Sequence, residues 1–60
     1  MKLEEFLQKE GISYPEFAAK IGVSLQSIYR YTAGTRLPER QVMARIMEET
    51  RGEVTADSFY

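Results

Sequence analysis

The sequence of 60 residues contains no cysteine and no histidine. The chain therefore forms no disulfide, and carboxylates are the only strong metal ligands left to it. It also lacks a glycine-rich phosphate loop, and so short a chain has little material to wall off a cleft. We expect no enzymatic activity, no metal site, no cofactor and no small-molecule ligand.

Long apolar runs are missing as well. No segment approaches the roughly 18 consecutive apolar residues that a membrane span requires. The opening residues, MKLEEFLQKE, carry acids where a signal peptide would have its apolar run. The sequence predicts a soluble cytoplasmic protein with no membrane association.

The composition is that of a small globular protein, since 43% of the residues are hydrophobic and 28% are charged. A chain of this length buries only roughly 60% of the surface that its unfolded form exposes, so its stability is marginal. We predict one domain spanning residues 1–60. Because disulfides and metals are excluded, well-packed helices or self-association must supply the stability.

Apolar residues recur at helical spacing in four segments, at about residues 3–10, 14–21, 25–32 and 38–51. Residues 53–60 predict a further short turn of helix that folds back on the core. Within this tail, Phe59 and Tyr60 either anchor it or contact a second subunit. The prediction is a compact all-α fold of four to five helices.

Local signals mark the ends of these helices. Ser13 and Glu16 have the spacing of a reciprocal capping box at the start of the second helix. Gly11 and Gly34 suit left-handed ends of the first and third helices. Gly22 suits the same role in the second helix, and Ser24 is the next N-cap candidate. Because only Val23 separates them, the second and third helices must cross at a steep angle.

The same patterns predict which side chains are buried. Met43 and Met47 fit either the core or a dimer surface, because methionine adapts to irregular contacts. The arginines of the fourth helix are expected to remain solvated and to balance nearby glutamates; they are Arg40, Arg45 and Arg51. The predicted core residues are Leu3, Phe6, Leu7, Phe17, Ala18, Ile21, Ile28, Tyr31, Val42 and Ile46.

Residues 14–33 resemble the helix-turn-helix of the phage Cro/CI type, also called the XRE family. The resemblance rests on a small residue in the first helix, a glycine four residues later, and apolar positions in register after it. It implies a lambda-repressor-like fold and a transcriptional regulator of phage or prophage type, acting as a repressor in a bacterial cell. The matching residues are Phe17, Ala18, Ile21, Gly22, Val23, Ser24, Ile28, Tyr31 and Gly34.

In this family the second helix of the pair enters the major groove of operator DNA. The resemblance implies base contacts from Leu25, Gln26, Tyr29 and Arg30. Gln26 suits adenine and Arg30 suits guanine, whereas Leu25 offers only apolar contact. Phosphate contacts are expected at helix N-termini and in the following loop. The candidates are Ser13, Tyr14, Lys20, Ser24, Ser27, Thr35 and Arg36.

The charge is unevenly distributed. The net charge is −1, but residues 20–38 hold three basic residues and no acid, leaving −4 for the remainder. Such a patch predicts weak binding by one subunit and a homodimer, at least on DNA. The alternative is a small protein-interaction module, antitoxin-like or adaptor-like, that does not bind DNA; the acidic pI of about 5.3 favours it.

Overall fold

The computed structural model describes residues 1–59, which form four α-helices and a short 3₁₀ helix, with no strand in that range. The all-α prediction is confirmed. Tyr60, considered above for the tail, lies outside the described residues. Within residues 1–59, no helix has the length and apolar character to cross a membrane. The elements are α1 (Leu3–Glu10), α2 (Tyr14–Ile21), α3 (Leu25–Ala33), α4 (Arg40–Glu49) and η1 (Ala56–Phe59).

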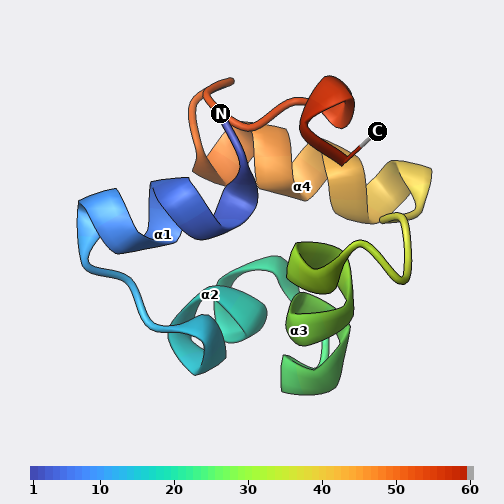
Figure 1. The fold of residues 1–60 in the computed structure, drawn as a ribbon, viewed down its shortest axis with the longest axis horizontal. Coiled ribbons are helices and arrows are strands. Elements are labelled where there is room, and N and C mark those ends of the chain that lie inside the picture. Colours follow the sequence, from blue (N-terminus) through green and yellow to red (C-terminus); the bar gives the residue numbers. More distant parts are fainter. Residues whose placement is uncertain (60) are drawn as a thin grey trace.

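The arrangement in space separates α4 and the tail from the α2–α3 pair (Figure 1). α4 lies along one side of the molecule, and α2 and α3 lie on the opposite side. The axes of α2 and α3 point in different directions. The tail runs back past α4, and its Ser58 hydroxyl donates a hydrogen bond to the carbonyl of Met1 at 2.6 Å. Lys9 on α1 also bonds the tail, at 2.6 Å from Glu53. These two contacts fix the tail to the N-terminal segment, in agreement with the prediction that the tail folds back.

The predicted helix ends are largely confirmed. α1, α2 and α3 each end at a glycine with left-handed backbone. Ser13 accepts a hydrogen bond from the backbone N–H of Glu16 at 3.2 Å. The reciprocal bond of that capping box, from the N–H of Ser13 to the Glu16 carboxylate, is not formed within residues 1–59. A bond of this kind occurs at the start of α1, where Glu5 accepts from the N–H of Lys2 at 3.0 Å.

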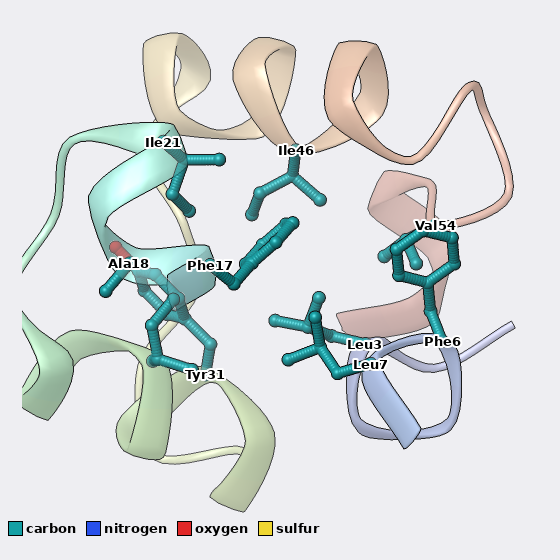
Figure 2. Packing of buried hydrophobic residues seen from close by; sticks show 10 residues of the cluster. Leu3, Phe6, Leu7, Phe17, Ala18, Ile21, Tyr31, Ile46 and Val54 are labelled. Carbon is teal, nitrogen blue, oxygen red and sulfur yellow. The ribbon is translucent and has the colours of Figure 1, made fainter. Parts of the chain in front are cut away.

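The core lies where all the helices converge (Figure 2). Phe17 of α2 points toward Ile46 of α4, and Leu3 and Leu7 approach from α1. Val42 and Met43 are half-buried against this core, whereas Met47 is exposed. The two methionines therefore do not share one environment. The buried hydrophobic residues are Leu3, Phe6, Leu7, Phe17, Ala18, Ile21, Ile28, Tyr31, Ile46 and Val54.

The C-terminal end of α4 differs from the prediction, because the helix stops at Glu49 instead of Arg51. The physical reason is Thr50, a buried residue whose hydroxyl donates to the carbonyl of Ile46 at 2.7 Å and accepts from the N–H of Val54 at 3.2 Å. The chain then reverses through two residues of positive φ, Arg51 and a glycine. This reversal delivers Val54 into the core.

Candidate nucleic-acid interface

The outward face of α3 is the centre of the candidate interface. Ile28 and Tyr31 point inward and are 0% and 4% exposed. The opposite face carries the four predicted base-contacting residues, all of them solvent-exposed: Leu25, Gln26, Tyr29 and Arg30. Since residues three and four apart lie on one side of a helix, these four side chains form one continuous surface.

The N-terminus of α3 is fixed by two serine hydroxyls. Ser24 accepts from the backbone N–H of Ser27 at 3.2 Å, and the two hydroxyl oxygens lie 3.0 Å apart. One hydroxyl donates to the other, so the second keeps its proton for an outside acceptor. Because a helix N-terminus also carries partial positive charge, this end of α3 can bind an anion.

The start of α2 lies against the middle of α3. Tyr14 is half-buried, and its ring centroid is 5.1 Å from that of Tyr29 at an interplanar angle of 55°. This tilted geometry is favourable for aromatic pairs. The contact places one predicted phosphate-binding side chain directly beside one predicted base-contacting side chain. It also restricts the ring of Tyr29, which is 54% exposed.

The loop after α3 holds two more of the predicted residues. Thr35 directs both of its donors at the carbonyl of Arg30: its N–H at 3.0 Å and its hydroxyl at 3.3 Å. Arg36 lies 3.8 Å from the carboxylate of Glu39. Thr35 therefore needs a rotation of its hydroxyl before it can donate to a phosphate, and Arg36 already faces one anion.

Lys20 is less closely associated with this surface. It is exposed in the last turn of α2, six residues after Tyr14, which is about 9 Å along the helix axis. Ser13, by contrast, is adjacent to Tyr14 at the exposed start of the helix. The structure thus brings Tyr14 and Tyr29 together, with Ser13 next to Tyr14 in the chain, and leaves Lys20 near the turn.

Three features were missed by the sequence analysis. The ring contact between α2 and α3 joins residues 15 positions apart and leaves no periodic signal. The ion pair of Arg36 with Glu39 could have been found, because it has i, i+3 spacing. Arg45 is exposed as predicted, but the prediction that it balances glutamates is wrong: its guanidinium donates instead to the carbonyl of Ile21 on α2 at 3.1 Å.

Two short helices joined by three residues, the second presenting an open face, define a helix-turn-helix unit. Residues 3–54 match the model of a protein family described as helix-turn-helix. The chain belongs to this family, whose Cro/CI-like XRE-type members are DNA-binding transcription regulators. Neither the curated proteins nor the solved structures that were compared contain a match to it.

Proposed function

We propose that this protein is a repressor of the phage Cro type that binds operator DNA as a homodimer in the bacterial cytoplasm, at the nucleoid. The observation that carries the proposal is the exposed face of α3, formed by Leu25, Gln26, Tyr29 and Arg30 on a helix whose other face is in the core. A helix presented in this way fits the major groove, which accepts one α-helix.

The chemistry of this face matches base edges. The amide of Gln26 can donate to adenine N7 and accept from adenine N6, and the fork of Arg30 can donate to guanine O6 and N7. Leu25 provides apolar contact, for instance with a thymine methyl group. Tyr29, with its ring beside Tyr14, presents its free edge and hydroxyl to the groove wall.

The proposed phosphate contacts surround this face. Ser13 and Tyr14 flank the start of α2, and Ser24 and Ser27 form the start of α3, where backbone dipoles favour anions. Lys20, Thr35 and Arg36 complete the set. Ser13 accepts a bond from its own helix, so its hydroxyl proton remains available for a phosphate oxygen.

The charge of this surface supports a dimer. Residues 20–38 carry three basic residues and no acid, in a chain whose net charge is −1. About three or four phosphate contacts give one subunit weak, strongly salt-dependent binding, and two subunits on a two-fold site double them. Dimeric helix-turn-helix proteins bind half-sites about one helical turn apart.

Repression by occupancy is the simplest mechanism that this recognition surface supports. A bound dimer covers promoter DNA and excludes RNA polymerase sterically. This mechanism requires only the recognition surface and a partner copy, and it draws on no ligand-binding or catalytic group.

The test is enrichment of bound sequences from a random pool of DNA duplexes at low salt. We expect a palindrome whose half-sites are separated by about 10 base pairs. Enrichment of a single unrepeated site would contradict the dimer. Titration with salt should lower log affinity by about 0.9 per phosphate contact for each decade of salt concentration.

The acidic pI of about 5.3 favours a second candidate, a protein-interaction module without DNA binding. The same titration separates the two. A DNA-binding protein should hold random duplex with a dissociation constant of roughly 1–100 µM and release it as salt rises. Absence of any binding at low salt would support the interaction module instead.

A further inference from the structure

The guanidinium of Arg45 connects α4 to the helix-turn-helix unit. Arg45 is exposed, but the next residue in sequence, Ile46, is fully buried in the core, so the backbone at Arg45 is well fixed. Its Nη1 donates to the carbonyl of Ile21 at 3.1 Å, across the region where α4 faces α2. Ile21 is the last residue of α2. Arg45 therefore supplies a donor to one of the carbonyls that a helix C-terminus leaves without a partner in the helix.

The same guanidinium occupies the space beside Gly22. This residue has a φ of +73°, and a Cβ atom built on it would lie 2.9 Å from Nη1 of Arg45. At the ends of α1 and α3, by contrast, a Cβ on Gly11 or Gly34 would meet nothing within 4 Å. Gly22 is thus favoured by its backbone conformation, and a Cβ there would displace the flexible end of the Arg45 side chain.

The electrostatics favour this arrangement. The C-terminal end of a helix carries partial negative charge, and a cation there is stabilising. The other arginines of this region provide a comparison, since neither Arg40 nor Arg51 forms a side-chain hydrogen bond or ion pair within residues 1–59. Arg45 is the α4 arginine whose charge is placed against another helix.

The place of contact matters because it is where the chain changes direction. Ile21 and Gly22 are followed after one residue by Ser24, the N-cap of α3. Any movement of the end of α2 is therefore transmitted to the start of α3. A bond that anchors the end of α2 to α4 therefore also constrains the place from which α3 begins.

We infer that Arg45 is a positioning residue for DNA recognition: by holding the turn between α2 and α3, it sets the orientation of the exposed α3 face. This inference rests on the proposed function, and it adds a residue that makes no contact with DNA itself. Its effect falls on discrimination between sequences, because discrimination depends on the exact placement of α3 in the groove.

The first experiment compares Arg45→Ala, Arg45→Lys and the control Arg40→Ala, which removes the same charge from the same helix. The measured quantity is the ratio of affinities for the selected operator and for random duplex, taken well below each variant's melting temperature. We expect Arg45→Ala to lower this ratio about tenfold, as loss of a charge-assisted hydrogen bond would. Arg45→Lys keeps one charged donor and should restore part of the ratio, and Arg40→Ala should leave it unchanged.

Other outcomes overturn the inference. If Arg45→Ala and Arg40→Ala weaken all duplexes equally, Arg45 contributes only charge. If Arg45→Ala lowers the melting temperature but leaves the ratio intact, its role is structural. If Arg45→Ala fails to fold, the comparison of Arg45→Lys with Arg40→Lys gives the same decision. Failure of the unaltered protein to bind any duplex is a separate result, and it removes the proposed function together with this role.

A second experiment needs no DNA. Gly22→Ala should destabilise the protein both through its positive φ and by displacing Arg45, whereas in an Arg45→Ala background only the φ cost remains. A double-mutant cycle on the unfolding equilibrium should therefore show coupling, with Gly22→Ala changing the unfolding constant less in that background. The control is Gly11→Ala, which should combine additively with Arg45→Ala. Additive effects at Gly22 as well would show that the guanidinium does not hold the turn.

Discussion

The two faces of α3 are under different physical constraints, although both belong to the same helix of nine residues. Ile28 and Tyr31 fill a space bounded by other helices, so their size and shape are dictated by packing. Gln26 and Arg30 contact solvent, and the fold places no such demand on them. The residues of the inner face therefore determine stability, and those of the outer face determine what the helix can bind. Substitutions on the two faces should separate these properties.

The largest effect is expected on the inner face. Ile28→Ala removes a fully buried side chain and leaves a cavity, which costs about 2–5 kcal/mol of unfolding free energy. Denaturant unfolding followed by circular dichroism measures it. The matched control is Leu25→Ala on the outer face of the same helix, which should cost less than about 1 kcal/mol. Equal losses at both positions would abolish the distinction between the faces.

The next effect concerns discrimination on the outer face. Gln26→Ala should lose about 1–3 kcal/mol of preference at a single base-pair position and leave binding of random duplex almost unaltered. Arg36→Ala should instead weaken all sequences alike and reduce the salt slope by about 0.9. Affinities for the operator and its single-base variants, measured across a salt series, test both. Equal loss of discrimination from the two changes would refute the proposed division of roles.

A smaller effect is expected where α2 supports the outer face, at the contact of Tyr14 with Tyr29. Tyr14→Phe keeps the ring pair and removes the hydroxyl, so it should weaken all duplexes uniformly. Tyr14→Ala also removes the ring contact, worth about 0.5–1.5 kcal/mol, and should alter preference at the position that Tyr29 is proposed to read. Operator selection with both variants distinguishes them. Identical sequence preferences in Tyr14→Ala and the unaltered protein would show that the ring of Tyr29 keeps its position without the contact with Tyr14.

The smallest effect lies away from both faces. The hydrogen bond from Lys9 to Glu53, together with its opposite charge, raises the pKa of Lys9 above the usual 10.5. Because the folded pKa exceeds the unfolded one, this stabilisation is complete below pH 10.5 and is lost as pH rises through the folded pKa. Unfolding of Lys9→Met compared with the unaltered protein should show a gap that closes at alkaline pH. DNA discrimination at neutral pH should be identical in the two.

Short-range signals explain how much of the fold could be predicted. The glycine ends of α1, α2 and α3, the serine caps and the inward residues at i, i+3 spacing all depend on neighbours in sequence, and the structure contains them. The outward set on α3 was instead implied by the resemblance to the helix-turn-helix of the Cro/CI type, and the structure exposes all four of its residues. The early end of α4 could not be predicted in this way, because it depends on Thr50 bonding the tail at Val54.

Long-range contacts account for what the sequence did not reveal in the candidate site. Arg45 and Ile21 are 24 positions apart, and nothing in the local sequence of α4 distinguishes Arg45 from Arg40. The ring contact between Tyr14 and Tyr29 depends on the angle between α2 and α3, which a periodic pattern does not determine. Side chains that join one helix to another require the assembled fold.

The ion pair of Arg36 with Glu39 has one consequence for how the protein would meet DNA. A phosphate approaching this guanidinium competes with a carboxylate 3.8 Å away, so binding there exchanges one anion for another. On the proposed function, the exposed carboxylate acts as an internal counterion and weakens attraction to arbitrary duplex, while the proposed base-reading residues of α3 are unaffected. A modestly charged domain would thus leave incorrect sites quickly and remain longer where its side chains match the bases.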